Sequence, residues 1–243
     1  MSFSDMDGAT KAEQGTAVSN NASVTVDVHF DFVCPWCLIG KRNLDAAVSR
    51  LASLRPDVNV KARWHSHQLL PDTPVGGVPY QAFYVARLGS PGAVAARRAQ
   101  VQEAAHAAGI ELVFDRIEVM PNTRAAHKLV AWATAANTGA ACKPALLIDR
   151  LFTGYFMDGE DIGNPDVLER IGLACGLDAA GLADHLTMSQ REEHVALSRS
   201  PQADEVRGVP HFVVNSALSL SGAYSPGAIV DAMLRSIGDQ ENR

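Results

Sequence analysis

The most informative stretch of the sequence is V-T-V-D-V-H-F-D-F-V-C-P-W-C, from Val24 to Cys37. Apolar residues occupy every second position from Val24 to Phe32, which is typical of a half-buried β-strand. Two cysteines separated by two residues follow at once. Pro35 suits the first turn of a helix, because its missing N–H would be unpaired there in any case. The stretch therefore predicts a strand that leads into a cysteine pair at the start of a helix.

The segments on either side complete an α/β pattern. Apolar residues recur at helical spacing from Leu38 to Leu54, and the residues from Val58 to Trp64 alternate again as a second strand. Val209 to Val214 and Leu218 to Leu220 flank a polar turn and predict a hairpin. A last helix is expected from Gly227 to Ile237. The order is thus βαβ at one end of the chain and ββα at the other.

A long segment with helical periodicity separates these two ends. Prolines and glycines interrupt residues 71–79, and roughly five to seven helices are expected from Tyr80 to Glu205. The fold class is therefore α/β with an all-α insertion. The predicted boundaries are a disordered tail over 1–23, the first half of the core over 24–75, the helical insertion over 76–205 and the second half of the core over 206–243.

The composition argues against several classes of function. Lysine and arginine number 21 against 27 aspartate and glutamate, a net charge of −6, which disfavours nucleic-acid and anionic-membrane partners. No apolar run reaches the ~18–20 residues of a membrane span. The N-terminal residues have neither a basic start nor an apolar core, so no secretory signal is expected. With only 4 cysteines, the chain is expected to be cytoplasmic and reduced.

The cysteine pair carries the clearest chemical signal. Unpaired N–H groups and the positive end of the helix dipole stabilise a thiolate at a helix start. We expect Cys34 to be an exposed nucleophile and Cys37, one turn further, to be the less exposed resolving thiol. A structural zinc site is the alternative, but it needs four ligands, and Cys142 and Cys175 are far apart in the sequence. Redox chemistry without a metal is favoured.

Other residues near the pair have two interpretations each. Asp31 could relay protons to the second cysteine or could be a solvated aspartate at a strand end. Trp36 is expected to be exposed, as an apolar contact for substrate or as ordinary packing. Cys142 and Cys175 are most simply small core residues, and a second disulfide between them is the less favoured interpretation.

The chain resembles the DsbA family of thioredoxin-fold proteins, and more closely its cytoplasmic FrnE-like branch. The motif D-F-x-C-P-W-C-x-x-G of that branch occurs at residues 31–40. Further similar stretches are N-T-R-A-A-H at 122–127, L-F through Y-F to D-I within 151–162, and G-V-P at 208–210 with S-G-A at 221–223. The resemblance spans residues 24–237 and implies a thioredoxin fold interrupted by the helical insertion. Residues 64–69 and Tyr224 depart from the branch and leave substrate preference open.

The resemblance also implies a substrate platform. It implies a cis peptide bond before Pro210 that faces the cysteines, and a Val209 backbone that pairs with an extended substrate segment. Pro35 and Trp36, between the two cysteines, would complete the platform. Three further side chains are candidates to line or tune the groove: Asn122, His127 and His211. His127 is otherwise a core or helix-cap histidine.

The implied function is thiol–disulfide exchange with protein or small thiol substrates. The redox-active pair would itself be the cofactor, and a thiol pool such as glutathione would recycle it. One alternative is a glutathione-dependent isomerase or transferase, as in the related 2-hydroxychromene-2-carboxylate isomerases and kappa-class transferases, which carry serine at the position of Cys34. Retention of both cysteines favours redox chemistry. A non-enzymatic peptide-binding holdase is a second alternative, and the sequence indicates no oligomeric state.

Overall fold

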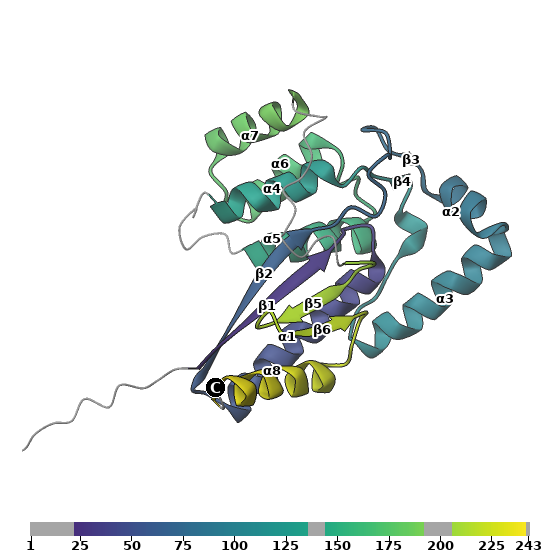
Figure 1. Ribbon diagram of the computed structural model, residues 1–243. Helices are drawn as coiled ribbons and strands as arrows, with labels where there is room; N and C mark the ends of the chain where they lie inside the picture. The colour runs from purple at the N-terminus through teal and green to yellow at the C-terminus, as the bar shows by residue number, and fades with distance from the viewer. Residues whose placement is uncertain (1–21, 136–143, 192–205, 242–243) are drawn as a thin grey trace, which may run out of the picture.

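The computed structural model describes residues 22–135, 144–191 and 206–241. Its centre is a four-stranded sheet (Figure 1) in the order β2-β1-β5-β6. The strands are β1 (Ala22–Phe30), β2 (Val58–Ser66), β5 (His211–Val214) and β6 (Leu218–Ser221). β1 and β2 are parallel, whereas β5 is antiparallel to both β1 and β6. The predicted βαβ and ββα ends therefore meet in one sheet with β1 at its centre.

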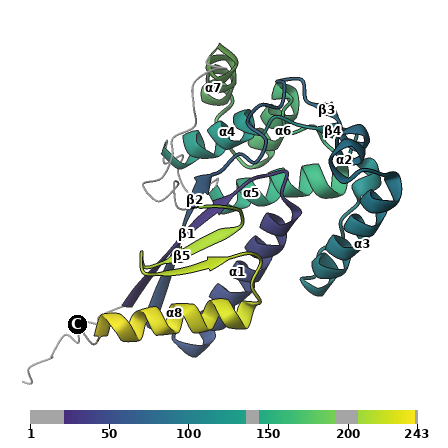
Figure 2. The same ribbon diagram turned by 45° about the vertical axis from the view of Figure 1, so that its right-hand side comes forward.

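Two helices cover one face of this sheet (Figure 2): α1 (Pro35–Leu54) and α8 (Pro226–Glu241). The alternating valines of β1 pack there against Leu44 of α1 and Met233 of α8. β1 ends at Phe30 rather than at Phe32, because the backbone N–H of Cys34 donates to the carbonyl oxygen of Asp31 at 3.2 Å and closes a turn. The thiol pair thus lies just beyond the strand end.

The insertion contains six α-helices among the residues that the structure describes, within the predicted number. They are α2 (Tyr80–Leu88), α3 (Pro91–Ala107), α4 (Arg124–Ala135), α5 (Pro144–Thr153), α6 (Pro165–Ala174) and α7 (Ala179–Arg191). Short turns of 3₁₀ helix at Phe114–Arg116 and of π-helix at Gly154–Asp158 accompany them. A small antiparallel pair, β3 (Val78–Pro79) with β4 (Val119–Met120), was not predicted, since two-residue strands leave no periodicity to read.

The insertion is fused to the core around the start of α1. Phe30 and Phe32 belong to the same apolar cluster as Leu129 of α4 and Phe152 of α5. Lys41 of α1 is buried, and its Nζ lies 2.8 Å from carboxylate oxygens of Asp45 and of Asp149 on α5. A buried lysine needs such partners because desolvation of an unpaired charge is costly. The cysteine pair is therefore held between the two parts of the chain.

Within the described ranges, no helix combines the length and apolar composition needed to cross a membrane. Three parts of the sequence predictions lie outside the described residues: the tail through residue 21, Cys142, and the end of the insertion from 192 to 205.

Candidate active site

The cysteine pair opens α1 as the sequence predicts. Cys34 is the N-cap residue, with extended backbone, and Pro35 occupies the first turn. The carbonyl oxygen of Cys34 accepts from the backbone N–H of Cys37 at 3.0 Å and of Leu38 at 3.4 Å. No side chain caps the helix start. Cys34 thus sits where free N–H groups and the helix dipole favour negative charge.

The segment before β5 lies against this helix start. The Val209–Pro210 peptide bond is cis, which confirms the expectation. The thiol of Cys34 donates to the carbonyl oxygen of Val209, with Sγ 3.6 Å from that oxygen. Gly40 of α1 permits this approach: a Cβ there would lie 2.9 Å from Cγ of Pro210 and 3.1 Å from Phe212.

We expect Gly40→Ala to destabilise the protein by about 1 kcal/mol. Alanine is favoured over glycine in a helix interior by ~1 kcal/mol, but overpacking of a buried site costs about 1–3 kcal/mol and outweighs that gain. Urea unfolding measures the difference. Gly76→Ala is the control, because no atom lies within 4 Å of its added Cβ. Equal effects of the two substitutions would contradict the close approach.

Asp31 is fully buried, so the interpretation of Asp31 as a solvated aspartate at a strand end is wrong. Its Oδ1 accepts from the backbone N–H of Phe32 at 2.8 Å and lies 3.1 Å from Nε2 of His127. Its Oδ2 accepts from the backbone N–H of Leu69 at 2.7 Å. Nδ1 of His127 has no hydrogen-bond partner among the described residues. The structure thus brings together Asp31 and His127, two residues 96 positions apart.

Cys37 is buried and interacts with this carboxylate and with the thiol of Cys34. Burial raises the pKa of Cys37 well above its ordinary value, and hydrogen bonding to Cys34 and the charges of Cys34 and Asp31 raise it further. Cys37 is therefore a neutral thiol at physiological pH. It must lose its proton before it can attack another sulfur.

A cavity of about 450 Å³ leads to Cys34. Its walls include Trp36, Tyr80 and Tyr84, together with three arginines: Arg87, Arg97 and Arg98. The prediction that Cys34 is exposed is wrong: its exposed fraction is 5 %, because α2 and α3 supply most of these walls. Trp36 is likewise half-buried, with the Arg97 guanidinium 5.8 Å from the centre of its ring.

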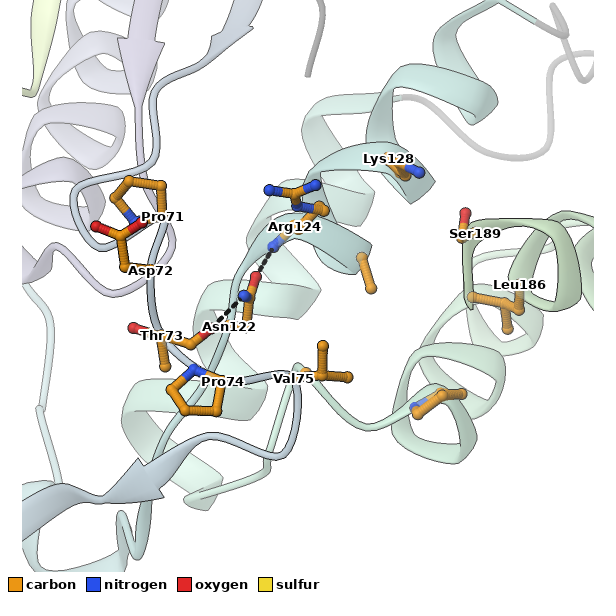
Figure 3. A pocket seen from close by; sticks show the side chains of 13 residues that line it. Pro71, Asp72, Thr73, Pro74, Val75, Asn122, Arg124, Lys128, Leu186 and Ser189 are labelled. Carbon is orange, nitrogen blue, oxygen red and sulfur yellow. Dashed lines mark hydrogen bonds between the residues drawn. The ribbon is translucent and has the colours of Figure 1, made fainter. Parts of the chain in front are cut away.

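Asn122 lines a different cavity, of about 500 Å³, between the 71–75 loop, the start of α4 and the end of α7 (Figure 3). Its side-chain N–H donates to the carbonyl oxygen of Thr73 at 2.6 Å, and its Oδ1 accepts from the backbone N–H of Arg124 at 3.0 Å. Neither Asn122 nor His127 lines the cavity that contains Cys34. Their predicted place in the groove is therefore corrected: Asn122 anchors a loop and His127 holds Asp31.

His211 joins a row of histidines across the sheet. His29 is opposite His65 on one neighbouring strand and opposite His211 on the other. The ring of His29 stacks on that of His65 at 4.9 Å and lies 6.0 Å from that of His211, centre to centre. Nδ1 of His211 lies 2.7 Å from Oγ of Ser221. His211 follows Pro210 directly, so this row adjoins the active site.

We expect the protein to lose stability as the pH falls from about 6.5 to 4. Burial and the neighbouring His65 and His211 lower the pKa of His29 from 6.5 to about 4. The folded state thus keeps His29 neutral while the unfolded chain takes up a proton, so stability is full above pH 6.5 and is lost on acidification, by about 3 kcal/mol. Urea unfolding at a series of pH values measures this slope.

In the His29→Leu variant, the loss of stability over the same pH range should be smaller by about this amount, because leucine does not titrate. His106→Gln, a change at an exposed histidine of α3, should keep the slope of the unmodified protein. A slope that survives in His29→Leu would assign the acid sensitivity to other groups.

No cluster of three or more metal-ligating side chains is found in the described part of the chain. Cys34, Cys37 and Cys175 are buried. The alternatives that involve Cys142, a zinc site or a second disulfide, fall outside the described residues.

The comparisons with known proteins agree with this architecture. A model of the DSBA-like thioredoxin domain matches residues 25–234. An uncharacterized Bacillus subtilis protein, YwbO, is 23% identical over 229 residues, covering 91% of this chain and 99% of that protein. Among solved structures, a probable DsbA oxidoreductase from Streptomyces coelicolor superposes with a TM-score of 0.70 at 22% identity, over 88% of this chain and 90% of that chain.

A 2-hydroxychromene-2-carboxylate isomerase has the same fold, with a TM-score of 0.59 at 17% identity over 90% of this chain and 98% of that chain. The family match covers the sheet, the cysteine pair and the insertion together. The chain therefore belongs to the DSBA-like thioredoxin domain family.

Proposed function

We propose that this protein is a thiol–disulfide oxidoreductase that exchanges disulfides with protein or small thiol substrates through Cys34 and Cys37. The observation that carries the proposal is the position of Cys34. Cys34 is the N-cap residue of a 20-residue helix, and its Sγ lies 3.6 Å from the carbonyl oxygen of Val209. A helix start favours the thiolate, and the thiolate is the reactive form.

The exchange proceeds in two displacements. The Cys34 thiolate attacks one sulfur of a substrate disulfide, forms a mixed disulfide and releases the other sulfur as a thiolate. Cys37 then loses its proton and attacks Sγ of Cys34, which forms the Cys34–Cys37 disulfide and releases the second substrate thiolate. The substrate disulfide gains two electrons, and the protein dithiol is oxidised. The same steps in reverse donate a disulfide.

Asp31 is the proposed proton acceptor for Cys37. Its carboxylate interacts electrostatically with that thiol and is held in the buried turn by three hydrogen-bond partners. Removal of the proton is required because the pKa of Cys37 is raised. His127 acts through Asp31 as a positioning residue.

The backbone of Val209 is the proposed platform for extended substrates. β5 begins only at His211, so Val209 precedes the paired part of the strand and lies beside the reacting sulfur. A substrate segment can add there as a short strand. Pro35 and Trp36 line the cavity that contains Cys34 and supply apolar surface there.

We further propose a reducing, cytoplasmic setting, with glutathione or another thiol pool as the recycling partner. The low cysteine content supports this, because disulfide-stabilised proteins of oxidising compartments are usually richer in cysteine. The redox centre needs no group beyond the two thiols.

The test is transfer of a disulfide to a client. The reduced protein is first oxidised with glutathione disulfide, freed of small molecules, and mixed with a reduced, unfolded ribonuclease. We expect the ribonuclease to gain disulfides while Cys34 and Cys37 become free thiols, as followed by mass spectrometry after alkylation. Binding of the client without any change in thiol content would instead support the holdase alternative.

A further inference from the structure

The cavity above Cys34 has an unusual charge for this protein. The chain as a whole carries a net charge of −6. The charged side chains that line this cavity are all arginines: Arg87 at the end of α2, and Arg97 and Arg98 on α3. Local positive potential in an acidic protein draws anions to one place and raises their association rate.

Arg97 lies over a residue of the cysteine motif. Its guanidinium is 5.8 Å from the centre of the ring of Trp36, which stands between the two cysteines in the sequence. The guanidinium of Arg97 donates a hydrogen bond to the neutral side-chain Oε1 of Gln100, at 2.6 Å. The positive charge of Arg97 at the cavity wall is therefore not neutralised by that contact.

Arg98 also lines the cavity and is less exposed than Arg97. Its guanidinium lies 5.2 Å from the ring centre of Tyr80 and 5.7 Å from that of Phe114. Its carboxylate contact, with Asp115 at 3.2 Å, involves a side chain that is 95% exposed, so solvent screens that pair. Nε of Arg98 is buried and has no hydrogen-bond partner among the described residues.

Tyr84 interacts both with Cys34 and with the three arginines. Burial and the adjacent Cys34 raise the pKa of its hydroxyl, whereas Arg87, Arg97 and Arg98 each act to lower it. One side chain is thus within electrostatic reach of Cys34 and of all three arginines.

We infer that this cavity selects thiols and disulfides that carry carboxylates close to the sulfur. The inference rests on the proposed exchange function and names the substrate class of the same site. Guanidinium groups bind carboxylates through paired hydrogen bonds, and a cavity of about 450 Å³ has the size of a small-molecule site. Glutathione and acidic peptide segments are two sources of this chemistry.

With glutathione disulfide as the substrate, the atoms and electrons balance as in the proposed exchange. One glutathione disulfide accepts two electrons and two protons and becomes two glutathione thiols, while the Cys34 and Cys37 thiols become one disulfide. The arginines take no part in bond making. They hold the carboxylates of the mixed disulfide and of the departing thiol.

The test compares disulfides of different charge. Reduced protein is mixed with glutathione disulfide (anionic), hydroxyethyl disulfide (neutral) or cystamine (cationic), and oxidation is followed in single turnovers at low and high salt. Because the three probes differ in intrinsic reactivity, each variant's rate is divided by that of the unmodified protein with the same probe.

We expect Arg97→Gln to lower the rate with glutathione disulfide by about two- to fivefold more than the rate with hydroxyethyl disulfide, the scale of one exposed ion pair. Arg97→Lys, which keeps the charge, should recover most of the lost rate. Arg235→Gln, on the exposed face of α8, should resemble the unmodified protein with every probe. High salt should reduce the preference for the anionic probe.

Matched peptide disulfides with glutamate or lysine beside the cysteine distinguish the sources. A charge effect with these peptides and not with glutathione assigns the site to acidic protein segments, and the reverse assigns it to glutathione. If every probe reacts and Arg97→Gln changes all rates by the same factor, the inference is overturned while exchange stands. If no probe oxidises the cysteine pair, the proposed function itself fails.

Discussion

Cys37→Ser protein will accumulate a stable mixed disulfide with glutathione or with client protein through Cys34. The first displacement needs only Cys34, whereas release of the bound substrate needs the second thiol. Exchange turnover should fall by roughly a thousandfold, the scale for loss of a covalent catalytic group. Non-reducing gels and intact-mass measurements show the trapped adduct.

Cys34→Ser is the matched control, because it removes the attacking thiol and keeps Cys37 buried at 2% exposure. It should form no adduct. Equal trapping by the two variants would contradict the assigned roles, and trapping through Cys175 would place the reactive thiol elsewhere.

Asp31→Asn should destabilise the folded protein by about 2–3 kcal/mol. The amide nitrogen would replace an oxygen that now accepts a backbone N–H, either from Leu69 or from Phe32, so a buried donor would face another donor. The resolving step should also slow, because Cys37 would lose its proton acceptor. Urea unfolding and the lifetime of the mixed disulfide measure the two effects separately.

Asp231→Asn, at an exposed position of α8, controls for the loss of one negative charge. His127→Gln should lengthen the mixed-disulfide lifetime in the same direction as Asp31→Asn, because it removes a partner of the carboxylate. Loss of stability with an unchanged lifetime in Asp31→Asn would make Asp31 purely structural.

The strands and the cysteine pair could be predicted because their signals are local. Alternating valines from Val24 to Val28 face a helix layer on one side only, so the period of two survives in the sequence. Pro35 after an extended Cys34 marks the helix start in the same way. The cis bond before Pro210 was expected from resemblance alone, since a proline in sequence does not reveal its isomer.

The cavity walls could not be predicted, because they depend on where the insertion folds back. Tyr84 and Arg97 look in sequence like ordinary residues of amphipathic helices, and nothing near them indicates that they meet Cys34. The same holds for the buried contact of Asp31 with His127, whose partners are separated by 96 positions. Long-range packing, not local pattern, decides the exposure of Cys34 and Trp36.

An equilibrium titration in glutathione buffers tests whether Cys34 and Cys37 form one redox couple. At each ratio of reduced to oxidised glutathione, free thiols are alkylated and mapped by mass. We predict a single two-electron transition in which Cys34 and Cys37 lose and regain their thiols together, with Cys175 unchanged throughout. Cysteines that titrate independently, or a pair that stays reduced at every ratio, would show that the two thiols are not a redox couple.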